Sequence, residues 1–306
     1  MTKVPAGWHA LAERSRDPRC GSIYVVGETD SGKTALSRWL LEHTPARPAW
    51  YLDCDLGQSV LGPPATVGLA EARNSGEGDG DFDPPLLSFV GSTSPARHLL
   101  QTLSGVARLA GEVPAEALMV CDSSGFVSGR LGGEFQYNLI NLLRPELLVA
   151  IDADESLRTT LKPFESAGDI EVLHVERDPQ CGTKSRAVRT AYRAERFAHH
   201  FIDARTTRLP MSDLAVHGMV PDALSRPSVR HRLCAVLDTR QFVQALGVVL
   251  DAEIVAGAIE SIELLAPAFD GERAASVQLG SLRLSPGELT YRAQREQTSP
   301  LPTAAG

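Results

Sequence analysis

The clearest chemical signal in the sequence is a phosphate-binding pattern near its start. Residues 27–34 read GETDSGKT, in which two glycines, a lysine and a threonine have the spacing of a nucleoside-triphosphate loop. Glycines let backbone N–H groups turn inward around a β-phosphate, the lysine reaches the β- and γ-phosphate oxygens, and the threonine hydroxyl binds Mg²⁺. We therefore expect a nucleoside triphosphate and Mg²⁺ to contact Gly27, Glu28, Thr29, Asp30, Ser31, Gly32, Lys33 and Thr34.

Carboxylates follow the next predicted strand, where they could take part in phosphoryl transfer. Residues 53–58 read DCDLGQ and end the apolar run after the loop's helix. A carboxylate at this strand end can take the proton from a hydroxyl that attacks the γ-phosphate. Asp55 is favoured for this general-base role over binding Mg²⁺ through water, whereas Asp53 is favoured as a strand cap. Asp122, which closes a later strand, is a further candidate for holding Mg²⁺ and water.

A basic segment in the second half of the chain supplies positive charge. Residues 184–208 contain seven lysines and arginines against two acids, in a chain whose formal net charge is −8. Arg189 and Arg193 are four residues apart, so on a helix they share one face and can reach phosphates together. Taken alone, the segment fits a solvated helix face as well as a phosphate-binding lid. Phe197 and Phe201 are expected to pack.

The pattern of apolar runs predicts the elements that position these residues. Strands are expected at 22–26, 49–55, 117–122, 147–152 and 170–175, and helices at 33–43, 97–109, 134–143 and 184–201, with a loop at 62–85. Strands that alternate with helices form parallel units covered on both faces. The expected fold is an α/β P-loop NTPase with a mostly parallel sheet flanked by helices. Short β-rich runs then predict a small C-terminal β-rich domain at 205–294, followed by a flexible tail at 295–306.

Composition limits the classes of function. Of the 306 residues, 43% are apolar and 22% are charged, which suits a globular core. No apolar run approaches the roughly 20 residues that cross a bilayer, and the first residues lack the apolar block of a signal peptide, so a cytoplasmic protein without membrane contact is expected. The net charge argues against a protein coated by nucleic acid but allows a local basic site. The five cysteines form no C-x-x-C pair, which argues against a zinc site or a disulfide framework.

Several blocks together resemble the polynucleotide 5′-hydroxyl kinase family. This family includes the RNA kinase of the pre-mRNA cleavage factor, the kinases of ribosomal RNA processing and their archaeal and bacterial relatives. In family order the blocks are GETDSGKT, YLDCDLGQS with a following GPP, VGSTSPARH, DSSGFVSG, LGGEFQ and TKSRAVRTAYRAERFAHHF, across about residues 22–203. The chain resembles a short bacterial or archaeal type of member, with an N-terminal arm at 1–21 and a kinase domain with clasp and lid at 22–204.

The resemblance implies further site residues. Asp55 corresponds to the family's general base, with Gln58 beside it on the metal and phosphate side, and the implied metal-binding residues are Thr34, Asp55 and Gln58. The clasp, which grips the terminal nucleotide of the acceptor, has Phe126 where the family usually has a tryptophan that stacks on the first base. Residues 91–95 resemble another acceptor-side loop. The implied acceptor contacts are Ser123, Ser124, Gly125, Phe126, Gln136 and Lys184, and the lid's three basic positions are Lys184, Arg189 and Arg193, the first usually an arginine.

The resemblance implies an ATP-dependent kinase that transfers the γ-phosphate to the 5′-hydroxyl end of RNA, with DNA ends as a further acceptor and GTP as a further donor. Two other hypotheses stay open: an ATP-binding scaffold of RNA processing that transfers no phosphate, and a kinase of a small metabolite or nucleoside. Eukaryotic members carry a β domain before the loop that helps to hold the adenine. Here either Trp8 in the short arm covers the base, or base selectivity is loose.

Overall fold

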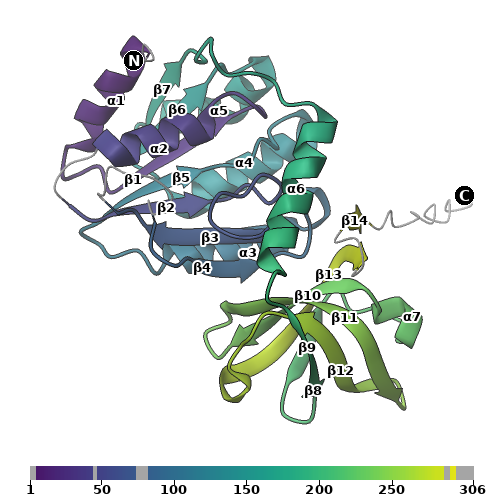
Figure 1. Cartoon of the computed structure of the whole chain (residues 1–306). Helices are drawn as coiled ribbons and strands as arrows, with labels where there is room; N and C mark the ends of the chain where they lie inside the picture. The colour runs from purple at the N-terminus through teal and green to yellow at the C-terminus, as the bar shows by residue number, and fades with distance from the viewer. Residues whose placement is uncertain (1–4, 44–46, 74–81, 286–289, 294–306) are drawn as a thin grey trace, which may run out of the picture.

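A parallel sheet forms the centre of the N-terminal part of the molecule (Figure 1). The computed structural model describes residues 5–43, 47–73, 82–285 and 290–293. Five parallel strands lie side by side in the order β2 (Ala49–Asp53), β5 (Leu118–Asp122), β1 (Ser22–Gly27), β6 (Leu147–Ile151) and β7 (Glu171–Val175). Most of these strands are buried on both faces, as the near-continuous apolar runs in the sequence predict.

Two antiparallel strands extend this sheet beyond β2; the sequence predicted a loop over the first and no element over the second. They are β3 (Thr66–Glu71), which pairs with β2, and β4 (Leu86–Phe89). The loop prediction for residues 62–85 is therefore wrong over β3. Its TVGLAE run is almost wholly buried, but prolines and glycines on either side gave it the look of a loop in the sequence. The acidic tip at 74–81 lies outside the described residues.

Helices cover both faces of the sheet, as expected. One face packs against α1 (Ala6–Ser15) and α2 (Lys33–His43) through a core cluster that contains Leu36, Leu40 and Val149. The other face packs against α3 (Leu99–Ala110), α4 (Gly129–Leu143) and α5 (Glu155–Ala167). Sequence analysis assigned no element to α5, which begins where the Asp154 side chain caps it by accepting a hydrogen bond from the Leu157 N–H at 2.7 Å.

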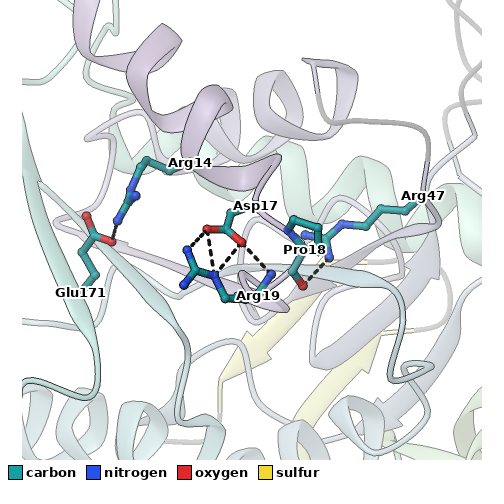
Figure 2. A network of polar contacts seen from close by, with 6 residues as sticks. All are labelled: Arg14, Asp17, Pro18, Arg19, Arg47 and Glu171. Carbon is teal, nitrogen blue, oxygen red and sulfur yellow. Dashed lines mark hydrogen bonds and ion pairs between the residues drawn. The ribbon is translucent and has the colours of Figure 1, made fainter.

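The N-terminal arm contains a helix that is fastened to the sheet domain. Trp8 of α1 is only 6% exposed, and its ring lies 5.6 Å from that of Trp39 on α2. Arg14 forms an ion pair with Glu171 of β7, and the Arg47 guanidinium donates to the carbonyl of Pro18 at 3.5 Å (Figure 2). These contacts give Trp8 a packing role in the core between the two helices.

The lid helix α6 (Arg186–His200) joins the two parts of the chain. Figure 1 shows it running from the top of the parallel sheet down to the C-terminal sheet. At its lower end Phe197 and Phe201 are buried in a cluster with Phe89 of the first sheet and apolar residues of the second, including Leu233 and Leu246. The predicted packing role of both phenylalanines is confirmed.

The C-terminal part is a second sheet, as the β-rich texture after residue 205 predicted. Its path is β14-β13-β10-β11-β12-β8, with β9 paired to β13. Its strand β13 is long, at 12 residues, where the sequence predicted only short β-rich runs. The elements are β8 (Arg205–Pro210), β9 (Ala215–Gly218), α7 (Arg226–Val229), β10 (Arg232–Asp238), β11 (Val243–Val255), β12 (Ala258–Ala266), β13 (Ala274–Ser285) and β14 (Thr290–Ala293).

The predicted tail at 295–306 lies outside the described residues. In the described ranges, none of the helices has both the length and the apolar character needed to span a bilayer. The five cysteines are free thiols, and Cys54 and Cys121 lie in the core of the first sheet.

Candidate active site

The predicted chemical residues meet because β5 lies between β1 and β2. In the parallel registers Asp122 is opposite both Val25 and Asp53. The phosphate loop follows β1. Asp53 is the last residue of β2, Asp55 comes two residues later, and Asp122 is the last residue of β5. Because parallel strands bring their carboxyl ends to one edge of a sheet, segments from three parts of the sequence form a single site.

The phosphate loop holds its lysine inward. Lys33 is 6% exposed, and its Nζ donates to the carbonyls of Gly27 at 3.0 Å and Glu28 at 2.7 Å. Burial lowers the pKa of Lys33, while the nearby carboxylates, Asp122 first among them, act in the opposite direction. The ammonium group therefore lies at the base of the loop, where it can bind phosphate oxygens.

Thr34 contacts an acidic residue that the sequence left as an alternative. Its hydroxyl donates to Asp122 Oδ2 at 2.5 Å, and the Tyr51 hydroxyl donates to the same oxygen at 2.7 Å. Asp122 is buried, and burial raises its pKa, while Lys33 and the two hydrogen bonds act to lower it. Asp122 is therefore placed, together with Thr34, where it could hold Mg²⁺, and this contact depends on the order of the strands in the sheet.

Asp55 lies half-buried at the start of a tight turn. Its Oδ1 accepts hydrogen bonds from the N–H groups of Gly57 and Gln58, both at 2.9 Å. The Gln58 amide nitrogen donates to the Gly57 carbonyl at 3.1 Å, while the buried Oε1 of Gln58 has no hydrogen-bond partner. The turn thus holds one oxygen of the Asp55 carboxylate. The side-chain oxygen of Gln58, in the same turn, can still accept a hydrogen bond or bind a metal ion.

These oxygens fit Mg²⁺. This ion prefers a few oxygen ligands from the protein, with water and substrate phosphates completing the shell. The Asp122 Oδ1 and the Gln58 Oε1 are both buried without a hydrogen-bond partner. Over the described ranges, no group of three or more His, Cys, Asp or Glu residues could hold a metal by itself. The donor set therefore suits an ion that arrives together with a triphosphate.

Asp53 has a different environment from Asp55. Its Oδ2 accepts from the Ser59 hydroxyl at 3.1 Å and from the N–H groups of Val60 at 2.6 Å and Leu61 at 3.2 Å. It is buried, and burial raises its pKa to about 7. The side chain thus fixes the 59–61 turn.

The lid helix docks on that turn and on the phosphate loop. At 59–62, the Tyr192 hydroxyl donates to the Ser59 carbonyl at 2.8 Å, and Arg196 donates to the carbonyls of Val60 and Gly62 at 3.0 and 2.7 Å. Sequence analysis did not assign Tyr192 or Arg196 to the site, because their partners are backbone atoms more than 130 residues away.

The predicted lid residues reach the site in different ways. Arg189 forms an ion pair with Asp30 Oδ2 of the phosphate loop at 3.1 Å, and the same oxygen accepts from the backbone N–H of Lys184 at 2.9 Å. Arg193 lies near the Asp55 turn, since its Nη1 is 3.8 Å from the position of a Cβ added to Gly57. The Lys184 side chain is exposed, 5.9 Å from the Tyr192 ring.

The predicted clasp packs directly on the phosphate loop. A Cβ added to Gly125 would lie 2.4 Å from the Thr29 hydroxyl oxygen and 2.8 Å from the Thr29 nitrogen, so only glycine allows this approach. Ser123 and Ser124 are buried. Phe126 is half-buried and packs against the core, with its ring centroid 5.9 Å from that of Phe135.

Gln136 is placed differently from the predicted substrate contact. It is fully buried; its Oε1 accepts from the Tyr24 hydroxyl at 2.6 Å, and its Nε2 donates to the carbonyls of Ser124 at 3.3 Å and Phe126 at 3.0 Å. A side chain that ties two clasp carbonyls to β1 holds the clasp in shape. We therefore correct its assignment to a positioning residue.

The fold and the site together define a P-loop nucleotide-binding protein with a lid. A family model described as the mRNA cleavage and polyadenylation factor CLP1 P-loop matches residues 27–203, which covers the loop, the clasp and the lid. The chain belongs to this family.

Curated relatives carry kinase names. The chain is 27% identical over 199 residues to a polyribonucleotide 5′-hydroxyl-kinase of Methanocaldococcus jannaschii, covering 64% of this chain and 54% of that protein. It is 27% identical over 220 residues to the protein of the same name from Pyrococcus horikoshii, covering 71% and 60%. The chain thus spans little more than half the length of these relatives.

Solved structures agree with the fold. A wild-type Clp1p–Pcf11p complex has a Clp1p-like chain that superposes with a TM-score of 0.65 at 14% sequence identity, covering 90% of this chain and 78% of that one. At this identity the likeness concerns the fold alone. It confirms the expected α/β P-loop architecture with an additional β-rich domain.

Proposed function

We propose that this chain is an ATP-dependent kinase that phosphorylates the 5′-hydroxyl end of RNA. The observation that carries the proposal is the meeting of a triphosphate loop, the Asp55 carboxylate and the Arg193 guanidinium at one sheet edge under a lid. A carboxylate beside a phosphate loop serves transfer to a hydroxyl, because it can accept the proton that the hydroxyl loses. The names of the archaeal relatives support the same reaction.

The donor would be bound by the loop and by Lys33, whose ammonium group neutralises phosphate charge. Mg²⁺ would be held by Thr34, Asp122, Asp55 and Gln58, and it supplies charge neutralisation and alignment of the β- and γ-phosphates. The ion pair between Asp30 and Arg189 keeps the Arg189 guanidinium at the phosphate loop. Its charge is thereby placed to stabilise the transferring phosphoryl group.

Asp55 acts on the acceptor. Its carboxylate takes the proton of the 5′-hydroxyl as the new oxygen–phosphorus bond forms and the bond between the γ-phosphorus and the bridging oxygen of ADP breaks. The two N–H groups of its turn hold the carboxylate in one orientation throughout. Arg193, next to the same turn, neutralises charge on the acceptor side.

The clasp would bind the terminal nucleotide. Phe126, which is only partly buried, would offer its ring as a stacking surface for the first base. Ser123, Ser124 and Gly125 shape the floor beneath it, and the exposed Lys184 side chain can reach a backbone phosphate. DNA ends would be accepted by the same contacts, because none of them reads the ribose 2′-hydroxyl.

The test is transfer of labelled γ-phosphate from ATP to a 5′-hydroxyl RNA oligonucleotide. DNA and duplex ends form the other acceptor arms, GTP replaces ATP in a parallel series, and EDTA removes Mg²⁺. We expect a labelled 5′-phosphate on RNA that disappears with EDTA. If no nucleic acid accepts phosphate and a nucleoside or small metabolite does, the chain is a small-molecule kinase.

The second candidate is an ATP-binding scaffold. One observation favours it. Arg189 of the lid forms an ion pair with Asp30 of the same chain, so this arginine already has an acidic partner other than a phosphate. ATP that binds tightly without turnover on any acceptor of the panel would support the scaffold and overturn the kinase.

A further inference from the structure

The C-terminal domain holds a segment that borders the candidate active site. A Cβ added to Gly57 would lie 3.1 Å from the carbonyl oxygen of Thr93, 3.6 Å from Asp55 Oδ1 and 3.8 Å from Arg193 Nη1. The loop around Thr93 therefore lies beside the carboxylate that we assign as the general base. It forms part of the wall against which an acceptor must fit.

This loop has a defined shape of its own. The Ser92 hydroxyl donates to the Ser94 carbonyl at 2.9 Å and accepts from the Ser94 N–H at 3.2 Å. The short helix η1 (Pro95–Arg97) follows and ends at the buried His98. The loop and η1 thus form a compact segment, residues 91–98, whose position depends on what holds its two ends.

Ser281 of the C-terminal sheet contacts both ends, and the N–H of the neighbouring Leu282 also donates to the Gly91 carbonyl at 3.2 Å. The carbonyl of Gly91 accepts from the N–H of Ser281 at 3.0 Å and from its hydroxyl at 3.1 Å. The same hydroxyl oxygen is 2.9 Å from His98 Nε2. A hydroxyl has one proton, so with that proton on the Gly91 carbonyl, His98 donates its Nε2–H to the serine oxygen.

The backbones touch at this point, which fixes the distance between the two domains. Gly91 has a φ of 78°, and a Cβ added to it would lie 2.5 Å from the Cα of Gly280. A Cβ on Gly280 would lie 2.8 Å from the Cα of Gly91. Only two glycines allow so close an approach, and it is this approach that brings Ser281 within reach of Gly91.

We propose that Ser281 is a positioning residue for acceptor binding. By fixing Gly91 and His98, it holds the Thr93 loop beside Asp55 and so shapes the acceptor side of the site. The inference rests on the proposed kinase function and gives the C-terminal domain a part in it. The side-chain hydrogen bonds of Ser281 go to Gly91 and His98, at the two ends of segment 91–98. Ser281 therefore affects the binding of the RNA end and not the binding of ATP.

The test compares Ser281→Ala with Ser276→Ala. Ser276 is a matched control because it lies on the same strand, is buried, and has two side-chain partners, Gln241 and His217, that belong to the C-terminal domain. For Ser281→Ala we expect the KM for a 5′-hydroxyl RNA to rise about tenfold, with the KM for ATP unchanged, because a displaced loop disturbs the fit of the acceptor. Ser276→Ala should change neither KM.

The outcomes separate this inference from the proposed function. A wild-type protein without transfer to any nucleic acid overturns the kinase itself. An active wild type with an unchanged acceptor KM in Ser281→Ala overturns the inference, as does an equal rise in Ser276→Ala. If Ser281→Ala does not fold, Ser281→Cys replaces it. The cysteine side chain is of similar size but is only a weak hydrogen-bond donor, so the same selective rise in the KM for RNA is expected.

Discussion

Two aspartates two residues apart have different tasks at this site. Asp53 is buried and accepts four hydrogen bonds, from the N–H groups of Asp55, Val60 and Leu61 and from a serine hydroxyl. Asp55 is half-buried and lies between the phosphate loop and the lid. The preference for Asp55 as the base, made from its position at the strand end, agrees with this geometry, because only the less enclosed carboxylate has access to an incoming hydroxyl.

Replacing Asp55 by asparagine is expected to lower kcat by about 10²–10⁴, since general-base catalysis contributes about that factor. The affinity for Mg²⁺ and ATP should fall much less, because Thr34, Asp122 and Gln58 remain to hold the ion. The asparagine keeps an oxygen that can accept from Gly57 and Gln58. The measurement is single-turnover transfer together with ATP binding. Asp53→Asn serves as the contrast and should mainly lower the melting temperature. Full activity in Asp55→Asn would remove the base assignment.

The contact between clasp and phosphate loop makes Gly125 a sensitive position. In Gly125→Ala the new methyl group must displace Thr29 backbone atoms that lie 2.7 and 2.8 Å away, at a cost of about 1–3 kcal/mol. We expect weaker ATP binding, by about tenfold or more, because the displaced atoms belong to the loop. The control is Gly182→Ala, where an added Cβ meets no atom within 4 Å. Equal ATP affinities in the two variants, measured by calorimetry, would contradict the role of the contact.

At the scale of elements, the lid helix is fastened at several places along its length. Near its start Asp30 accepts from Arg189 and from the Lys184 N–H, and in its middle Tyr192 and Arg196 bind the carbonyls of the 59–62 turn. At its end Phe197 and Phe201 enter the core between the two sheets. The helix therefore connects the phosphate loop, the Asp53 turn and the C-terminal domain in one rigid element.

The pairing of lid and loop predicts coupling between Asp30 and Arg189. The Asp30 side chain is 8% exposed and that of Arg189 28%, so their ion pair is only weakly screened. In a double-mutant cycle of Asp30→Asn and Arg189→Ala, measured by kcat/KM, we expect the second change to cost clearly less once the first is present. A coupling energy of about 1 kcal/mol is typical of residues in contact. Strict additivity would show that the two act separately.

At the scale of the whole molecule, the two sheets form a common core with the end of the lid. Leu233 and Leu246 of the C-terminal sheet pack in the same cluster as Phe89 of the first sheet. His200 at the end of the lid helix also contacts the second sheet, with its Nε2 3.3 Å from the Leu246 carbonyl. Changes at this junction should therefore affect the stability of the whole chain.

Burial lowers the pKa of His200 below its ordinary value of 6.5, so folding disfavours its charged form. The contribution of neutral His200 to folding stability is fully present above pH 6.5, the pKa of the unfolded chain. It is lost as the pH falls from there through the lower pKa of His200 in the folded protein. We expect the melting temperature to fall between pH 7 and pH 5, and to fall less in His200→Gln, which keeps a donor and does not titrate. His199→Gln, on the exposed neighbour, should behave as the wild type, and an unchanged slope in His200→Gln would contradict the prediction.

Features that depend on a short stretch of sequence could be predicted, and features that depend on contacts between distant residues could not. The five parallel strands and the helices α2, α3 and α4 could be predicted because each is a local apolar pattern, whereas α1 and α5 were not predicted. Strand β3 could not, because prolines and glycines flank its short buried run. Asp122 was left as an alternative because its contact with Thr34 depends on which strand lies next to β1, and strand order is not a local property.

The sequence alone determined the phosphate loop, the acidic turn after the next strand and the basic segment, because each is a short run whose residue types and spacing suffice to suggest its chemistry. Only the tertiary structure decided their partners: Asp122 on Thr34, Asp30 on Arg189, and Gln136 on the clasp backbone instead of on a substrate. It also decided that Ser281 holds the Thr93 loop. Apart from the contact of Gln136 with the clasp, these contacts join residues 88–190 positions apart, and such pairs exist only after strand order and packing have brought them together.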